Sequence, residues 1–368
     1  MTTFTTGHDG APPRRVLIVL FGAIGDVVRA LPLLGRIRKG WPDAHIAWAV
    51  EPKSAPIVQG HPSLDEVILY DRSRAPWSVP SFVRRVRAGR FDLAIDLQRI
   101  SKSGFVAWGS GARMRIGFHP SNTKEWNHLF SNIRVEEQPD MRLKLMQYQA
   151  FGDALGLPET DIEFCLAATD EERQRARELL KDAPRPLVAA FLGSSWPSRI
   201  YPPELTAETI RNLASSNGAG SALYPVLLGG PDEARDAELV MRALEGRALN
   251  LVTRTTLRDL IAIFPECVAS FGPDCGPMHI SAAVGCPVVS LWGATAPERS
   301  APWGFADFTL HGEIPCHPCY LRRCPVGREC MWRIDPAAVA ASIRRAIAST
   351  GAITRPLARE SATSGVVS

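Results

Sequence analysis

Short apolar segments alternate with amphipathic stretches along most of the chain, and this alternation constrains the fold more than any other feature. In the first half the apolar runs are VLIVLF (16–21), HIAWAV (45–50), EVILY (66–70) and DLAIDL (92–97), with helical patterns between them. Apolar runs of this length, separated by helices, are typical of parallel strands that are buried on both faces of a sheet. The sequence therefore predicts an α/β protein.

The alternation pauses near the middle of the chain and then restarts. A polar helical stretch over 169–186 ends in a Pro-rich turn and has few apolar residues to tie it to a core, which is typical of a boundary. LVAAFLG (187–193) opens a second series of strands and helices, and 368 residues are too many for one compact core. We therefore expect two Rossmann-like doubly wound domains facing a central cleft, with ligands outside the carboxyl ends of both sheets.

The expected boundaries follow from these two series. We predict a disordered tail (1–15), a first Rossmann-like domain (16–168), a linker region (169–186), a second Rossmann-like domain (187–333) with a Cys-rich segment (316–330), a C-terminal helix (334–349) and a disordered tail (350–368).

Composition excludes several classes of protein. The net charge of +4 gives no support for a nucleic-acid partner. No apolar run approaches the ~18 residues that a membrane span needs, and the first 15 residues lack the apolar core of a secretory signal. We expect a cytoplasmic protein that at most contacts a membrane surface.

The turn FGAIGDVVRALP (21–32) contains the first candidate for chemistry. Gly22 and Gly25 flank a strand-to-helix turn, and Asp26 lies where the helix begins. An Asp there is typical of a helix N-cap, but it is also placed to act as a general base at the cleft. The turn alone leaves both interpretations open, because it is not a complete dinucleotide fingerprint.

Two turns of the second series suit a nucleotide. GSSWPSRIYPPE (193–204) offers the hydroxyls of Ser194 and Ser195 and the charge of Arg199 to a phosphate, although Arg199 is equally consistent with an exposed loop. In LLGGPDEARDAEL (227–239), Asp232 or Glu233 is placed to accept hydrogen bonds from ribose. The alternative is that both acids only complement a helix dipole.

FGPDCGPMHISAA (271–283) crowds an acid, a thiol and an imidazole into six residues: Asp274, Cys275 and His279. A cysteine hydrolase would need these groups arranged as nucleophile, base and orienting residue. The strand–turn–helix setting instead favours an anion site made by the helix start at Gly276, Pro277 and Met278.

The chain resembles the ADP-heptose:lipopolysaccharide heptosyltransferases, glycosyltransferase family 9, over residues 16–348. VLIVLFGAIGDVVRALP paired with DCGPMHISAAVGCPVVSLWGATAPERSAPWG carries the resemblance. HIAWAVEPKSAPIVQGHPSLDEVIL and RFDLAIDLQRISKSGFVA are most similar to heptosyltransferase I.

The resemblance implies a GT-B fold and inverting transfer of heptose from ADP-heptose, with no required cofactor or metal. The acceptor would be the Kdo of lipid A at the inner-membrane surface. Asp26 matches the family's catalytic base. The implied donor or phosphate residues are Ser194, Ser195, Arg199, Asp232, Glu233, Asp274, Cys275, Gly276, Pro277, Met278 and His279; the acceptor residues are Gly25, Arg72, Arg74, Lys102 and Lys124.

Three positions depart from the family pattern: Cys275 stands where Thr or Ser is usual, Arg199 where Lys is common, and Arg99 where Gly is usual. A thiol is a weaker donor than a hydroxyl, and the planar Arg fork binds differently from Lys. Trp77, Trp108 and Trp126 lie near the acceptor segments, and we expect them to pack in the core rather than to meet lipid.

Four cysteines, Cys316, Cys319, Cys324 and Cys330, have the spacing C-x2-C-x4-C-x5-C. Their proximity to one another, with His317, leaves open a thiolate metal site, but the spacing lacks the second C-x2-C pair of a zinc ribbon. Plain thiols, reduced or paired, are the favoured interpretation. The alternatives to heptosyltransferase I are a same-family enzyme with another acceptor (heptosyltransferase II/III-like, capsule or glycoprotein) and a non-catalytic nucleotide-sugar-binding protein.

Overall fold

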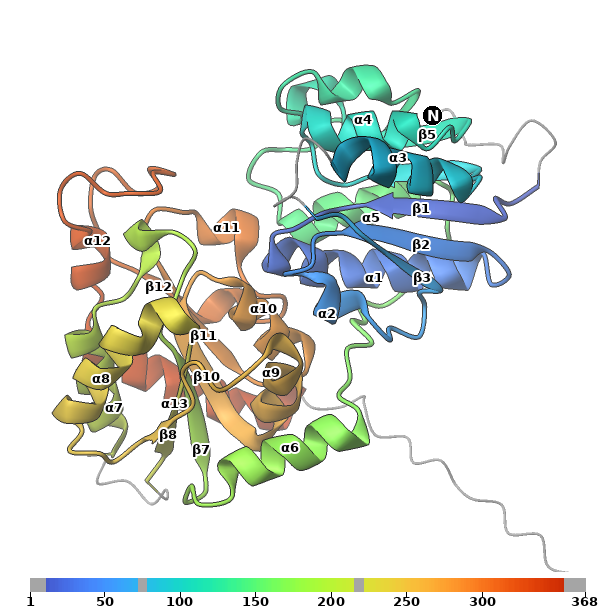
Figure 1. Cartoon of the computed structure of the whole chain (residues 1–368). Coiled ribbons are helices and arrows are strands. Elements are labelled where there is room, and N and C mark those ends of the chain that lie inside the picture. The colour runs from blue at the N-terminus through green and yellow to red at the C-terminus, as the bar shows by residue number, and fades with distance from the viewer. Residues whose placement is uncertain (1–10, 72–77, 215–221, 354–368) are drawn as a thin grey trace, which may run out of the picture.

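The computed structural model describes residues 11–71, 78–214 and 222–353. It contains two parallel six-stranded sheets, each covered by helices on both faces and each forming its own lobe (Figure 1). The predicted pair of doubly wound α/β domains is therefore confirmed.

The first lobe is built around a sheet with the strand order β3-β2-β1-β4-β5-β6. Its central strands are buried on both faces, as their continuous apolar sequences predict. The elements are β1 (Arg15–Val19), α1 (Ile24–Gly40), β2 (His45–Val50), α2 (Ala55–Val58), β3 (Glu66–Leu69), α3 (Ser78–Ala88), β4 (Leu93–Asp96), α4 (Ser101–Gly109), β5 (Met114–Gly117), η2 (Pro120–Asn122), η3 (Asn127–Phe130), β6 (Ile133–Arg134) and α5 (Lys144–Ala154).

The second lobe repeats this topology, with the order β12-β11-β10-β7-β8-β9. Its elements are α6 (Asp170–Leu180), β7 (Leu187–Phe191), η4 (Pro197–Arg199), α7 (Pro203–Ala214), β8 (Tyr224–Leu228), η5 (Pro231–Glu233), α8 (Ala234–Ala243), β9 (Leu249–Asn250), α9 (Leu257–Ile263), η6 (Phe264–Glu266), β10 (Cys267–Pro273), α10 (Gly276–Ala283), β11 (Val288–Trp292), α11 (Pro297–Ser300), η7 (Ala306–Phe308), β12 (Thr309–His311), α12 (Glu329–Trp332) and α13 (Pro336–Ile353).

Each sheet has one place where the chain reverses its direction of winding: between β1 and β4 in the first lobe, and between β7 and β10 in the second. We call this place the switch point of the sheet. In doubly wound sheets, ligands bind in the crevice at the carboxyl ends of the two strands that flank the switch point. The turns that follow β1, β4, β7 and β10 are therefore the ones that position a site.

The segment predicted as a linker is partly a packed helix. α6 lies against α9, with Ala176 and Leu180 buried, and a capping box at Thr169 and Glu172 fixes its start. Its few apolar residues all fall on one face, so they suffice to join it to the second lobe. Of the predicted tails (1–15 and 350–368), residues 1–10 and 354–368 lie outside the described residues, whereas Arg15 begins β1 and residues 350–353 belong to α13.

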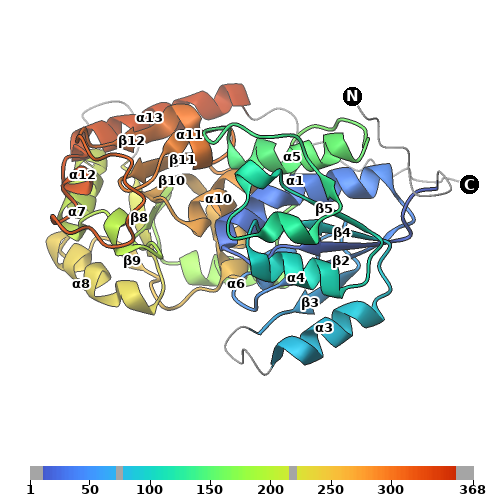
Figure 2. The ribbon, with the colours of Figure 1, turned by 90° about the horizontal axis from the view of Figure 1, so that it is seen from above.

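The two lobes meet where the start of α1 packs against the start of α10 (Figure 2). A Cβ on Gly276 would lie 2.8 Å from the Cβ of Ile24, and one on Gly25 would lie 2.7 Å from the Cδ2 of His279. Small residues on both helices are thus needed for the close approach, and one hydrophobic cluster continues through both lobes.

Gly276→Ala should loosen this contact between the lobes. The added methyl group overlaps Ile24, and overpacking of this kind costs about 1–3 kcal/mol, so we expect a lower melting temperature by calorimetry. Gly35→Ala is the control, because a Cβ there meets nothing within 4 Å and α1 gains a better helix former. A Gly276→Ala protein as stable as the Gly35→Ala protein would contradict the packing argument.

Candidate functional site

Asp26 lies in the first turn of α1, directly beyond the carboxyl end of β1. The N-cap of this helix is Ala23, whose backbone carbonyl accepts from the Asp26 N–H at 2.9 Å. Asp26 therefore does not cap the helix, and the N-cap interpretation is wrong. Its side chain is 18% exposed, so the carboxylate is largely withdrawn from water.

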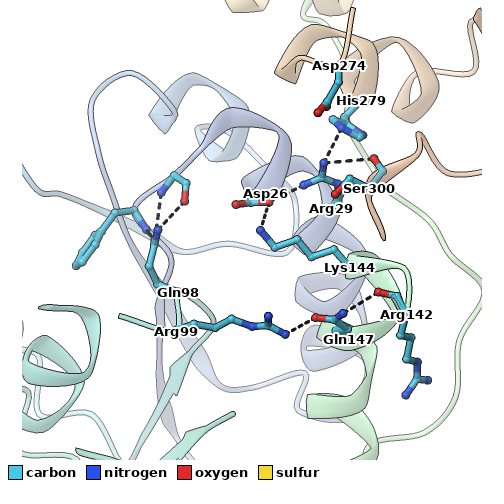
Figure 3. Close-up of polar contacts among 12 residues, drawn as sticks. Asp26, Arg29, Gln98, Arg99, Arg142, Lys144, Gln147, Asp274, His279 and Ser300 are labelled. Carbon is cyan, nitrogen blue, oxygen red and sulfur yellow. Dashed lines mark hydrogen bonds and ion pairs between the residues drawn. The ribbon is translucent and has the colours of Figure 1, made fainter. Parts of the chain in front are cut away.

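Two cations hold this carboxylate by one oxygen. Lys144 Nζ lies 2.6 Å and Arg29 Nη1 2.5 Å from Oδ1 of Asp26, and neither contacts Oδ2 (Figure 3). Burial by itself would raise the pKa of Asp26, but the charges of Lys144 and Arg29 outweigh it and leave the pKa below its usual value. Asp26 is thus ionised at neutral pH, with Oδ2 free of both cations.

Arg29 also connects Asp26 to the second lobe. Its Nη2 donates to Nε2 of His279 at 2.7 Å and to the backbone carbonyl of Ser300 at 3.4 Å (Figure 3). Burial, and then the charges of Arg29 and Lys144, hold the pKa of His279 well below its usual range. Because guanidinium only donates, Nε2 of the neutral ring must accept, which places the imidazole proton on Nδ1. The His279 ring is engaged with Arg29 rather than with a predicted phosphate site.

The turn after β4 braces the turn that leads to Asp26. Gln98 Nε2 donates to the Gly22 carbonyl at 2.8 Å, and its Oε1 accepts from the Phe21 N–H at 2.7 Å. Gln98 itself follows Asp96, which accepts from the Gln98 N–H at 3.0 Å. The switch point of the first sheet is therefore cross-linked by a single amide side chain.

A pocket of about 330 Å³ opens beside this turn, between the two lobes. Three of its lining side chains are cations: Arg99, Lys124 and Arg299. Asp140 is the acid in the lining, which leaves an excess of positive charge suited to an acidic ligand. The other lining residues are Ser121, Asn122, Thr123, Met141 and Tyr320.

Arg99 adopts a left-handed backbone conformation with φ of 70°. Glycine adopts this conformation without strain, which is consistent with the glycine that the family resemblance implies at this position. Its guanidinium stacks 4.2 Å from the centre of the Phe118 ring and donates to Oε1 of Gln147 (Figure 3). The departure from glycine thus adds a fixed cation to the pocket.

The other predicted acceptor residues are placed differently. Lys102 points its Nζ at the aromatic rings of Tyr70, at 4.5 Å, and Phe21, at 5.8 Å, and is absent from the pocket lining. Gly25 is covered by the His279 ring, so it serves lobe packing. Arg72 and Arg74, like Trp77, lie outside the described residues.

At the switch point of the second sheet, Arg199 lies in the segment that follows β7, and its side chain is held in place by neighbouring groups. Its Nη1 lies 3.0 Å from Oδ2 of Asp274, which also accepts from the Thr295 hydroxyl at 2.7 Å. The guanidinium stacks 3.9 Å from the Trp196 ring centre. Arg199 is therefore a held side chain, not a free loop arginine, and the Asp274 carboxylate orients it.

Some of the predicted hydroxyl and acidic side chains of the second lobe already make hydrogen bonds within the protein. Ser194 Oγ donates to the Asp274 carbonyl at 2.9 Å, whereas Ser195 is exposed. Glu233 accepts from the Gly230 N–H at 2.7 Å and packs against Gly193, whereas Asp232 is exposed. Of the two acids, Glu233 lies next to the turn that carries Ser194.

At the start of α10, backbone N–H groups rather than side chains are available to bind an anion. Cys275 is the N-cap residue and its thiol makes no capping hydrogen bond. Burial raises the pKa of Cys275 well above its usual value, so the thiol is neutral, and His279 is occupied by Arg29. The cysteine-hydrolase interpretation is therefore wrong. Pro277 has no N–H, so Cys275, Gly276 and Met278 are the donors available to an anion.

The four-cysteine segment does not bring its thiols together as a set of metal ligands in the part of the chain that the structure describes. The described residues contain no group of three or more His, Cys, Asp or Glu side chains that could hold a metal ion. His317 is hydrogen-bonded through Nδ1 to the Gly293 carbonyl at 2.5 Å and stacked on His311. Cys316, Cys319, Cys324 and Cys330 are free thiols in this structure.

Residues 79–329 match the model of "Glycosyltransferase family 9 (heptosyltransferase)", well over half of the chain. The chain belongs to glycosyltransferase family 9. It is 24% identical over 298 residues to the lipopolysaccharide core heptosyltransferase OpsX of Haemophilus influenzae, covering 80% of this chain and 83% of that protein. It is 25% identical over 328 residues to lipopolysaccharide heptosyltransferase 1 of Pseudomonas aeruginosa, covering 84% and 87%.

The fold also matches a solved family structure, the E. coli heptosyltransferase WaaC with ADP. The TM-score is 0.67 at 21% identity, over 90% of this chain and 99% of that one. The enzyme is thus a glycosyltransferase with the GT-B arrangement of two Rossmann-like domains. No helix among the described residues has the length and apolarity needed to cross a bilayer.

Sequence reasoning missed the partners of Asp26. Arg29 lies three residues further along the same helix, so its position on the face of Asp26 was visible in the sequence. Lys144, by contrast, is 118 residues away on α5, an element that the sequence analysis did not predict. Its sequence neighbourhood carries no signal that connects it with the turn after β1.

Arg199→Ala should weaken nucleotide binding. A hydrogen bond to a charged group contributes about 1.5–3 kcal/mol, so we expect a loss of about 10-fold to 150-fold in ADP affinity by calorimetry. Arg322→Ala is the control, because Arg322 lies 5.6 Å from the same Trp196 ring but is exposed. Equal ADP affinity in the two variants would rule out phosphate contact by Arg199.

Transfer should decline at alkaline pH through Lys144. Burial, opposed by Asp26 and reinforced by Arg29 and Arg99, lowers the pKa of Lys144 to about 8. Above that pH Lys144 loses its proton, and Asp26 loses one of its two ion pairs. The measurement is kcat/KM against pH.

Lys144→Arg keeps the positive charge at every accessible pH, so the alkaline decline should move upward. Lys102→Arg, which lies apart from Asp26, should leave the profile unchanged. A decline near pH 8 that persists in Lys144→Arg would show that another group titrates.

Proposed function

We propose that this enzyme transfers heptose from ADP-heptose to the Kdo of the lipopolysaccharide inner core, as heptosyltransferase I does. The observation that carries the proposal is the carboxylate of Asp26, ionised, with Oδ2 free of both cations, at the switch point of one lobe. Across the lobe contact lie the start of α10 and the held Arg199. The names of its relatives, lipopolysaccharide heptosyltransferases, and a neighbour's complex with ADP support this choice of substrates.

Asp26 acts as general base in this mechanism. Its Oδ2 accepts the proton of the attacking Kdo hydroxyl while the hydroxyl oxygen forms a bond to the anomeric carbon of heptose. The bond between that carbon and the ADP oxygen breaks, and ADP leaves with the electron pair. Attack from the face opposite ADP inverts the anomeric centre. Lys144 and Arg29 fix the carboxylate through Oδ1, so the reactive oxygen is held in place.

The departing diphosphate gains negative charge as the bond breaks. Arg199, held by Asp274 and Trp196, and the N–H groups at the start of α10 offer positive charge to it. Asp274 thus acts through Arg199, and Glu233 is the candidate for the ribose hydroxyls. We propose that these groups stabilise the leaving ADP without a required metal.

The acceptor pocket suits an acidic sugar. Arg99, Lys124 and Arg299 line it, and the charge of Arg99 acts on Lys144, which contacts Asp26. Kdo bears a carboxylate that such cations would bind. The lipid-linked acceptor would place the enzyme at the cytoplasmic face of the inner membrane. A heptosyltransferase II/III-like acceptor, already carrying heptose, is the second candidate, since relatives with those names also match.

Asp26→Asn should abolish transfer and retain donor binding. Loss of a general base lowers the rate by about 10²–10⁴-fold, measured by mass spectrometry of a heptose-deficient lipopolysaccharide incubated with ADP-heptose. Asp153→Asn is a matched control: Asp153 is ion-paired with Arg36 at 2.8 Å in the same lobe and is 58% exposed. Turnover by Asp26→Asn at the rate of Asp153→Asn would refute the assignment of the base.

The substrate pair is tested separately. Unmodified enzyme is incubated with ADP-heptose and, in turn, with acceptors that end in Kdo or in heptose. We expect a mass increase of one heptose only on the Kdo-terminated acceptor. Transfer only to the heptose-terminated acceptor would move the enzyme to the II/III type, and donor binding without any transfer would favour a binding protein.

A further inference from the structure

Large apolar side chains gather on the surface formed by α4 and η3. Phe105 is 39% exposed, Trp108 55%, Trp126 75% and Leu129 68%. We call these four residues the α4–η3 patch. The two elements lie side by side at the upper end of the first lobe in Figure 1. The ring centres of Phe105 and Trp108 lie 5.8 Å apart. The expectation that Trp108 and Trp126 pack in the core is therefore wrong.

The segment of chain that carries this patch is strongly basic. Residues 78–134 contain ten Lys and Arg against three Asp and Glu, an excess of seven, whereas the whole chain has a net charge of only +4. One of the three acids, Asp96, is buried. The exposed cations are Arg84, Arg85, Arg87, Arg90, Arg113, Lys124 and Arg134.

The patch adjoins the acceptor pocket. Lys124 lines the pocket, and Trp126 lies two residues further along the chain. Met141, 49% exposed, and Tyr320 of the second lobe, 41% exposed, line the same pocket. If the α4–η3 patch binds to a larger surface, the molecules of that surface therefore lie close to the mouth of the pocket.

We propose that the α4–η3 patch docks on an anionic lipid bilayer. Aromatic side chains favour the boundary between lipid headgroups and acyl chains, and nearby Lys and Arg side chains are attracted to anionic headgroups. Together they hold the pocket against the surface from which a lipid-linked acceptor projects. That last step rests on the proposed function, whereas the docking itself does not.

Charge distinguishes a bilayer from a second copy of the chain. A two-fold contact through this patch would bring two segments of excess charge +7 together, and like charges oppose such a contact. An anionic bilayer has the complementary sign. The patch thus fits lipid better than it fits itself.

The test uses flotation of the full chain with phosphatidylcholine vesicles, with or without phosphatidylglycerol, in the absence of any substrate. We expect binding to the anionic vesicles that weakens with added salt. The double variant Trp108→Ser/Trp126→Ser should bind them about tenfold more weakly, because apolar area entering the bilayer is lost. Trp332→Ser is the control, since Trp332 is 47% exposed on α12 of the other lobe.

If the double variant binds ADP as tightly as the unmodified chain does, the double variant is folded. Binding of the double variant to anionic vesicles as tight as that of Trp332→Ser would overturn the proposal. A change of oligomeric state with no effect on vesicle binding would assign the patch to a second copy. Transfer to a water-soluble Kdo acceptor is measured in parallel, so failed docking and failed chemistry are separated.

Discussion

The ion pairs of Asp26 with Lys144 and Arg29 are the interaction on which the rest of the site depends. They connect α1, which carries the carboxylate, with α5 of the same lobe, and through Arg29 with His279 and Ser300 of the other lobe. Both cations contact the same oxygen, so one interaction keeps the group ionised, orients it and leaves Oδ2 free of both cations. The contact between the lobes and the orientation of the Asp26 carboxylate are thereby linked, because the same guanidinium serves both.

The fold supplies two equivalent positions for this chemistry. Each lobe winds its sheet in the same order, so each has a crevice at the reversal point, and the two crevices meet where α1 and α10 approach. In the first lobe Gln98 ties the two crevice turns together. In the second, Asp274 holds Arg199 and itself accepts a hydrogen bond from Thr295. Gly25 and Gly276 permit the approach, because a side chain at either position would push the helices apart.

The architecture could be predicted well from the sequence because buried parallel strands consist of continuous apolar residues. The sequence also predicted candidate site residues at Asp26, Arg199 and the start of α10, since each lies in the segment that follows such a strand. It failed where the signal is not local. Lys144 reaches Asp26 from 118 residues away, and β5, β6 and β12 lack the continuous apolar runs that mark the other strands. Asp274, Cys275 and His279 are close in sequence, but the structure does not join them. Asp274 binds Arg199, His279 binds Arg29, and the Cys275 thiol makes no capping hydrogen bond. The sequence analysis also expected Trp108 and Trp126 to pack in the core, because aromatic residues usually do.

The central claim is that two cations hold the Asp26 carboxylate ionised in the free enzyme. The most direct measurement is an NMR titration of the ¹³Cγ resonance of Asp26, assigned by its disappearance in Asp26→Asn. We predict a pKa below the ordinary value of about 3.9 for Asp, because Lys144 and Arg29 outweigh burial. The pKa should rise in Lys144→Met. A carboxyl group that titrates near neutral pH in the unmodified enzyme would contradict the account.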